Sequence, residues 1–299
     1  MKILVSGASG LIGSALVRAS SGAGYTTTPL ARQRTPRSPG AIEWDPSAGT
    51  IDAASLEGFD AVVHLAGESI AAGRWTPEQK KRILDSRVQG TRLLSNTLAR
   101  LQRRPSVLVS ASAVGFYGDC GDRVLREDSP SGSDFLASVC REWEQATEPA
   151  SKAGIRVVHL RSGVVLARDG GALAKMLLPF KMGVGGKIGS GKQYMSWIDL
   201  EDEARVILHC ISHDSIRGPV NSVGPSAVTN LEFTKTLGRV LSRPTLFPLP
   251  ATIARLLFGE MADALLLSSQ RVEPAKLTAE GFDFRHRNLE DTLRRILNK

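Results

Sequence analysis

The sequence is poor in cysteine and has no long apolar run. Cys120, Cys140 and Cys210 are its only cysteines among 299 residues, and no two of them are spaced as CxxC. An odd, scattered set predicts neither a disulfide framework nor a zinc site, and it favours a reducing, cytoplasmic setting. The most apolar stretch, residues 251–267, is shorter than the roughly 20 residues of a membrane helix and is interrupted by charged side chains. We therefore expect no structural metal and no membrane partner.

The chain carries a net charge of +8, from 38 lysines and arginines against 30 acidic residues. Clustered cations bind the phosphates of nucleic acids. Here the basic residues gather at 32–37 and 80–104, with no aromatic residue between them and no recognisable nucleic-acid module. We expect a small anionic ligand and no nucleic acid.

Short β-rich runs alternate with longer helical patterns over the first 160 residues. The two prolines and the glycine of residues 34–40 predict a loop. Strands that alternate with helices of about ten or more residues form βαβ units, so the pattern predicts an α/β fold with a Rossmann-type, doubly wound parallel sheet. The predicted strands are residues 2–6, 25–30, 60–65, 106–110 and 155–160, and the predicted helices are residues 11–21, 77–103 and 134–152.

The pattern becomes less regular beyond residue 168. Glycines crowd residues 183–191, and prolines at 244, 248 and 250 predict a rigid connection. We therefore predict a nucleotide-binding core over residues 1–168, to which some later segments return. A smaller α+β substrate or cap part covers residues 169–299 and ends in a helical module from about residue 249. Its predicted elements are strands at 194–198 and 219–223 and helices from residue 200, over 229–241 and over 289–297.

Three glycines follow the first predicted strand and open the first predicted helix. Gly7, Gly10 and Gly13 are spaced as GxxGxxG. Glycine at these places permits a tight turn, lets the backbone approach a diphosphate and lets the helix pack closely on the strand. Free N–H groups and the helix dipole then stabilise the diphosphate. The dinucleotide contacts predicted in this loop are Gly7, Ser9, Gly10, Leu11, Ile12 and Gly13.

The end of the second predicted strand indicates which dinucleotide binds. An NAD site has an acidic residue about 20 residues after the glycines, and it accepts a hydrogen bond from the ribose 2′-hydroxyl. No acidic residue lies between Gly13 and Glu43, and the strand is followed instead by Arg32, Arg34 and Arg37. A guanidinium can bind a 2′-phosphate through two hydrogen bonds, so NADP is favoured over NAD. The alternative for Arg32 is a solvated loop cation.

Several strings of residues resemble the extended short-chain dehydrogenase/reductases, the NAD-dependent epimerase/dehydratase superfamily. They are residues 7–13, 64–67, 88–91 and 110–113, with Tyr117 and Gly118. The strings at 74–76, 194–198 and 259–262 resemble one divergent branch, the epimerase family proteins, some of which are labelled cell-division inhibitors. That branch carries a short C-terminal domain of unknown function. The resemblance implies a Rossmann core with NADP and leaves the substrate open.

Further cofactor contacts are predicted from these strings. Arg87 stands where the superfamily has Asn, on a helix that begins near the carboxyl ends of the strands. It either pairs with the pyrophosphate or lies on a solvated helix face. Glu68 is either a base or ribose contact, or a solvated loop residue. The full set is Leu65, Ala66, Gly67, Glu68, Arg87 and Ser110.

The catalytic set implied by the resemblance is incomplete. The superfamily uses a Ser and a YxxxK pair, in which the Tyr is the acid/base, but this chain contains no YxxxK string. The pair should fall at Phe135 and Val139, or at Leu136 and Cys140. A positioned acid/base contributes about 10²–10⁴-fold to such a reaction, so another group must supply it or the reaction is lost.

The candidate catalytic residues are Ser112, at the family's Ser position, and Tyr117, on the loop that follows. Ser112 either hydrogen-bonds a substrate carbonyl or caps the loop. Tyr117 is either the acid/base or an aromatic ring packed beside the cofactor. Two functions remain open. The first is an NADP-dependent oxidoreductase or epimerase that acts on a small polar substrate, which could resemble a nucleotide sugar. The second is a non-catalytic NADPH sensor or scaffold. Lys187 and Lys192, in the glycine-rich region, could meet an anionic substrate.

Overall fold

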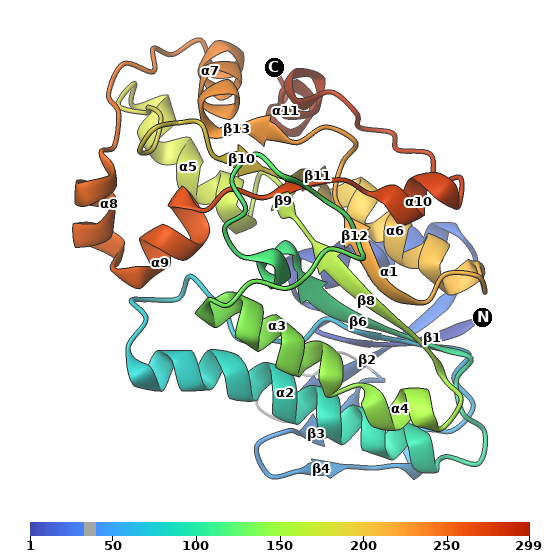
Figure 1. The fold of residues 1–299 in the computed structure, drawn as a ribbon. Helices are drawn as coiled ribbons and strands as arrows, with labels where there is room; N and C mark the ends of the chain where they lie inside the picture. The colour runs from blue at the N-terminus through green and yellow to red at the C-terminus, as the bar shows by residue number, and fades with distance from the viewer. Residues whose placement is uncertain (33–39) are drawn as a thin grey trace. The chain divides into compact units, whose positions relative to one another are not determined.

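The computed structural model describes residues 1–32 and 40–299. The chain forms two compact units (Figure 1), each built from several segments. Unit 1 comprises residues 1–113, 139–161 and 204–220, and unit 2 comprises residues 114–138, 162–203 and 221–299. In place of one boundary near residue 168, the chain passes between the units five times. Residues 204–220 return to unit 1 because they carry a strand of its sheet.

The large sheet has eight strands in the order β12-β8-β6-β5-β1-β2-β3-β4. The pairs β1–β2, β1–β5, β2–β3 and β5–β6 are parallel, and the edge strand β4 is antiparallel to β3. The order runs outward in both directions from β1, which is the doubly wound arrangement predicted from the sequence. The strands are β1 (Lys2–Ser6), β2 (Thr26–Arg32), β3 (Ile42–Asp45), β4 (Thr50–Ile51), β5 (Ala61–His64), β6 (Val107–Ala113), β8 (Arg156–Ser162) and β12 (Gly218–Ser222).

Continuous apolar runs place these strands at the centre of unit 1. Ile3, Leu4 and Val5 are fully buried, as expected for a parallel sheet with both faces covered. Helix α2 (Pro77–Arg100) begins as predicted, with Pro77 in its first turn and the Thr76 hydroxyl accepting from the Gln79 amide. The other helical segments are α1 (Leu11–Gly22), η1 (Ala54–Leu56), α3 (Phe135–Gln145), α4 (Glu148–Lys152) and α6 (Leu200–Ser212), of which α3 and α6 run from unit 2 into unit 1.

The single helix predicted over residues 134–152 is wrong, because the chain forms α3 and α4 there. Thr147 ends the first segment, and its hydroxyl donates to the carbonyl of Glu144 at 2.7 Å. Pro149 has no N–H group with which to continue the hydrogen bonds of α3 but is tolerated in the first turn of a helix, so a new helix begins at Glu148. In the described part of the chain, every helix is too short or too polar to span a bilayer.

Unit 2 contains small sheets and short helices, consistent with the predicted smaller α+β part. Helices α5, α7 and α11 pack around Trp197, Phe233 and Leu293. A capping box formed by Thr229 and Glu232 begins α7, within the helix predicted over residues 229–241. The strands of unit 2 are β7 (Val124–Leu125), β9 (Val164–Leu166), β10 (Tyr194–Met195), β11 (Trp197–Asp199), β13 (Val228–Thr229) and β14 (Arg271–Val272). Its helical segments are η2 (Val114–Tyr117), α5 (Gly171–Lys181), α7 (Asn230–Leu241), α8 (Ala251–Phe258), α9 (Glu260–Ala262), η3 (Asp263–Leu267), α10 (Ala275–Ala279) and α11 (Leu289–Leu297).

Candidate functional site

The loop between β1 and α1 can only be built with glycine at two positions. Gly7 has φ +72°, and a Cβ there would lie 3.0 Å from the amide nitrogen of Ala66. A Cβ on Gly13 would lie 2.1 Å from the carbonyl oxygen of Gly7, which no side chain could tolerate. The loop therefore packs directly on its own helix and on the end of β5. This is the close backbone approach that the GxxGxxG spacing predicts.

Gly10 differs from the other two glycines because its surroundings are less crowded. Of the described atoms, only the Gly7 carbonyl oxygen would come within 4 Å of a Cβ on Gly10, at 3.2 Å. Ser9 and Gly10 are exposed, Gly10 caps α1 without a side-chain hydrogen bond, and the first turn contains no acidic residue. The start of α1, with Leu11 and Ile12, thus offers the positive end of a helix dipole to an anion. These residues fit the diphosphate of a dinucleotide.

A buried serine fixes the second wall of this site. The Ser6 hydroxyl bonds Nδ1 of His64 at 2.6 Å, and its oxygen also accepts from the Leu65 amide at 3.2 Å. Burial lowers the pKa of His64 to about 4, so the imidazole is neutral at physiological pH. This neutral pair holds residues 65–67 against the glycine loop. Leu65 and Ala66 are half-buried and Gly67 is exposed, so the backbone of this segment is accessible beside the loop.

Arg87 of α2 joins this segment to the interior of unit 1. Its guanidinium donates from one nitrogen to the carbonyl oxygens of Glu68 at 2.9 Å and Ile83 at 3.1 Å. Its Cζ lies 4.9 Å from the ring centre of Trp143, and a Cβ on Gly67 would lie 3.4 Å from the same carbon. Burial lowers the pKa of Arg87, although an arginine stays protonated. The structure therefore brings Gly67, Glu68 and Arg87 together, and contact with a pyrophosphate stays a prediction.

Arg32 is the exposed last residue of β2 and lies opposite Trp44 of β3 in the parallel register. Its side chain therefore lies at the carboxyl edge of the sheet, two strands away from the segment that follows β5. Arg34 and Arg37, which the sequence also associates with a 2′-phosphate, lie outside the described residues, as does most of the loop predicted at 34–40.

Ser112 lies on β6 and forms a hydrogen bond with Glu144, which is itself part of a buried ion pair with Arg161. Its hydroxyl donates to Oε1 of Glu144 at 2.7 Å. Arg161 of β8 donates to both oxygens of the same carboxylate, from Nε at 2.8 Å and from its terminal nitrogen at 2.9 Å. The side chain of Arg161 is 4% exposed and that of Glu144 is 12% exposed. Because Glu144 takes the only proton of the Ser112 hydroxyl, the serine oxygen is left as a hydrogen-bond acceptor toward any further partner.

Cys140 lies beside Ser112 and Arg87, on the same face of α3 as Glu144. Its thiol is buried and lies 3.8 Å from the carbonyl oxygen of Ala113. Burial raises the pKa of this thiol to about 12, so it is protonated at neutral pH. A neutral thiol carries no charge with which to lower the pKa of a neighbouring hydroxyl. Cys140 therefore does not replace the lysine of the missing YxxxK pair.

The other two predicted residues near β6 are buried. Ser110 is fully buried and lies opposite His64 in the parallel register of β5 and β6. Tyr117 belongs to unit 2, where it is 1% exposed and donates its hydroxyl proton to the amide oxygen of Asn221 at 2.6 Å. Asn221 in turn donates to the carbonyl oxygen of Glu273 at 2.9 Å. The roles predicted for Ser110 and Tyr117 stay predictions.

Glu144 and Arg161 did not emerge as site residues from the sequence. The signal is present, since each is a charged residue inside a buried segment. Glu144 follows Cys140 by four positions and so lies on the apolar face of its helix, and Arg161 directly follows Leu160 near the end of a largely buried strand. A charge at such a place needs a partner of opposite sign. Which partner it finds depends on the order of the strands.

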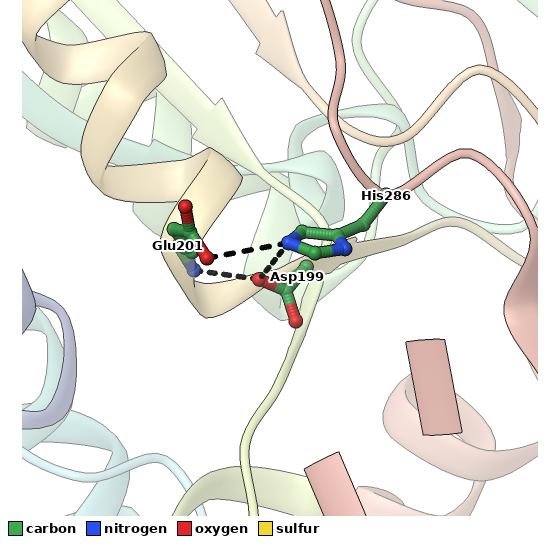
Figure 2. Close-up of side chains that lie close together, drawn as sticks. All are labelled: Asp199, Glu201 and His286. Carbon is green, nitrogen blue, oxygen red and sulfur yellow. Dashed lines mark hydrogen bonds and ion pairs between the residues drawn. The ribbon is translucent and has the colours of Figure 1, made fainter. Parts of the chain in front are cut away.

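A second polar cluster lies at the start of α6 in unit 2 (Figure 2). His286 Nε2 lies 3.3 Å from Glu201 Oε2 and 3.6 Å from Asp199 Oδ1, a grouping of ligand types that a metal ion can use. Each carboxylate already has an arginine partner: Arg295 pairs with Asp199, and Arg285 pairs with Glu201. The arginines supply the positive charge that a metal ion would bring. We interpret the cluster as a set of structural ion pairs that hold residues 285–286 against the start of α6.

The sequence profile of the NAD dependent epimerase/dehydratase family matches residues 3–224. That of a domain of unknown function, DUF1731, matches residues 249–296, in agreement with the C-terminal module expected from about residue 249. An epimerase family protein of Mycobacterium bovis is 44% identical over 291 residues, covering 97% of this chain and 96% of that protein. The human epimerase family protein SDR39U1 is 36% identical over 300 residues, covering 99% of this chain and all of that protein.

Solved structures share the fold over the whole chain. The crystal structure of human SDR39U1 (isoform 2) with NADPH has a TM-score of 0.92 at 36% identity and covers 100% of both chains. A nucleoside-diphosphate sugar epimerase from Corynebacterium glutamicum has a TM-score of 0.82 at 36% identity, covering 99% of this chain and 58% of that one. The Rossmann-like fold expected from the resemblance is therefore confirmed.

Proposed function

The chain belongs to the NAD dependent epimerase/dehydratase family, and from that premise we propose that it is an NADP(H)-dependent oxidoreductase or epimerase acting on a small polar hydroxyl compound. The observation that carries the proposal is the open first turn of α1 beside Gly10, close to the accessible backbone of residues 65–67. The human relative, crystallised with NADPH, supports the choice of dinucleotide.

Different residues of unit 1 are assigned to different parts of the cofactor. Gly7, Gly10 and Gly13 hold the diphosphate at the start of α1, and Arg32 binds the 2′-phosphate. The remaining proposed contacts are Ser9, Leu11, Ile12, Leu65, Ala66, Gly67, Glu68, Arg87 and Ser110. Bound NADP(H) would supply or accept a hydride, and this chain must then move the accompanying proton.

Ser112 and Glu144 are the groups we assign to that proton. Since Glu144 takes the Ser112 proton, the serine oxygen accepts a hydrogen bond from the hydroxyl of a substrate. The substrate proton can then pass to Ser112 Oγ as the serine proton passes to Glu144 Oε1. Arg161 keeps the carboxylate in place during this transfer. The arrangement therefore favours a substrate in its alcohol form, at a site without a tyrosine–lysine pair.

A second candidate function is a non-catalytic NADPH-binding sensor or scaffold. It is favoured by the bonding of both predicted catalytic hydroxyls, because Ser112 donates to Glu144 and Tyr117 donates to Asn221. With both protons held by protein acceptors, neither hydroxyl is free to donate to a carbonyl substrate.

Reduction of NADP⁺ with a panel of secondary alcohols, including nucleotide sugars, tests the two candidates. An enzyme should lose roughly 10²-fold in kcat in the Ser112→Ala variant, while NADPH affinity stays within about twofold. Tyr117→Phe, measured beside it, shows whether the phenol shares the role. An active parent whose Ser112→Ala and Tyr117→Phe variants both keep full turnover would contradict the catalytic assignment. A parent that binds NADPH and turns over no compound favours the sensor.

A further inference from the structure

Unit 2 exposes a concentration of large apolar side chains. Eight of the eleven exposed large hydrophobic residues in the described chain come from residues 178–184 and 246–257. Leu246 is 77% exposed, Phe247 59% and Met182 62%. Single exposed apolar residues are ordinary, but a concentration of this kind marks a contact surface.

The two segments run side by side, so their exposed residues form one face. Arg243 donates to the carbonyl oxygen of Lys181 at 2.9 Å, and the amide of Leu249 donates to the carbonyl oxygen of Lys187 at 2.9 Å. A Cβ on Gly183 would meet the ring of Pro244 at 3.8 Å. Helix α5 ends in the first segment, and most of helix α8 lies in the second (Figure 1). We call the surface formed by residues 178–187 and 243–257 the apolar face.

The apolar face carries more positive than negative charge. Residues 170–198 and 233–259 together contain eight lysines and arginines and no aspartate or glutamate. Two of these cations, Arg239 and Arg255, pair with acidic residues from other segments, Glu290 and Asp263. The face therefore combines exposed apolar side chains with an excess of positive charge. The prolines at 244, 248 and 250 keep Leu246 and Phe247 on a stiff, projecting segment.

We propose that the apolar face docks on the surface of an anionic lipid bilayer. Leu246, Phe247 and Met182 would enter the interface between headgroups and acyl chains, while Lys181 and Lys187 meet anionic headgroups. A second copy of this chain fits the face poorly, because a two-fold interface would set the same cations against one another. The expectation of no membrane partner rested on the lack of a long apolar run, and a surface contact needs no such run.

Co-sedimentation of the full chain with vesicles tests the proposal. The parent should bind vesicles of phosphatidylcholine and phosphatidylglycerol, bind more weakly as salt is raised, and fail to bind phosphatidylcholine alone. The Leu246→Ser, Phe247→Ser double variant should lose about tenfold or more in affinity, since it removes apolar insertion. Lys181→Glu should weaken binding as well. Val124→Ser, at an exposed apolar residue outside the face, is the matched control and should bind as the parent does.

All of these substitutions are at exposed positions, so thermal unfolding and the NADPH titration should be unchanged and report an intact fold. Failure of the parent to bind anionic vesicles, equal binding to neutral vesicles, or full binding by the double variant would each overturn the proposal. Sedimentation velocity provides the remaining outcome. A dimer dispersed by the same double substitution, without vesicle binding, would assign the face to a second copy.

Discussion

Arg32 is the residue from which the choice between the two dinucleotides was inferred. The parent should bind NADPH at least about tenfold more tightly than NADH, which corresponds to about 1.4 kcal/mol. Arg32→Ala should remove most of that preference, because NADH lacks the 2′-phosphate that we assign to this guanidinium. Arg18→Ala, at an exposed arginine on α1, makes the same charge change and should keep the preference. Calorimetric titrations with both dinucleotides measure it, and equal affinities in the parent would contradict the assignment.

Glu203 is a fully buried acid at the start of α6. It accepts from the hydroxyls of Ser162 and Ser222, each at 2.5 Å, and burial raises its pKa to about 7. The folded state therefore holds this proton more tightly than the unfolded state does. Stability from Glu203 is fully present below about pH 4.5 and is lost as pH rises toward 7, by on the order of 3 kcal/mol.

Glu203→Gln keeps an acceptor for the serines and cannot ionise, so it isolates this effect. The difference in unfolding free energy between variant and parent should grow in favour of the variant as pH rises from about 4.5 to 7, and then level off. Urea unfolding at a series of pH values provides the measurement. A difference that is constant over this range would mean that folding does not raise the pKa of Glu203.

Residue roles were predictable where the sequence carries a local signal. The glycines and Arg32 stand at fixed distances from a strand and a helix, so their places in the fold could be inferred from spacing. Glu144 and Arg161 could not be paired in this way, because 17 positions separate them and their meeting depends on how α3 packs against β8. The direction of the Ser112 hydrogen bond could not be predicted either, because the sequence does not show that Glu144 is its acceptor.

At the scale of elements, the loop between β1 and α1 makes a prediction that separates two glycines. Gly10→Val should fold and lose dinucleotide binding, because its side chain would occupy the exposed place beside the first turn of α1 where we expect the diphosphate. Gly13→Val should fail to fold or unfold at markedly lower temperature, since its Cβ would lie 2.1 Å from the Gly7 carbonyl oxygen. Thermal unfolding and NADPH titration distinguish them. Parental NADPH affinity in Gly10→Val would place the diphosphate elsewhere.

Elements with their own start and stop signals were predicted best. Helix α11 occupies the predicted residues 289–297, and Asn288 caps it by accepting from the Glu290 amide at 2.8 Å. The single helix predicted over 134–152 was wrong. The amphipathic pattern continues through Thr147, but the first helix ends at Gln145 and a second begins at Glu148, with Pro149 in its first turn. The apolar face was missed for a related reason: a run of apolar residues does not reveal whether a fold buries it.

At the scale of the molecule, the sequence predicts a core over residues 1–168 to which unspecified later segments return, and the chain passes between the two units five times. The core predicted over residues 1–168 contains every strand of the large sheet except β12, which comes from residues 218–222. The sequence of β12 does not show which strand it pairs with, because residues of the other unit separate it from β8 along the chain. The NADP-binding assignment depends on unit 1 alone, and the apolar face depends on unit 2 alone.

Hydrogen–deuterium exchange with and without NADPH tests the central claim, that unit 1 binds the dinucleotide at the glycine loop. Bound ligand slows exchange of the amides that it contacts or orders. We predict slower exchange in residues 7–13 and 64–68 at saturating NADPH, with α5 and α8 unchanged. Slower exchange confined to unit 2, or none anywhere at saturation, would contradict the account.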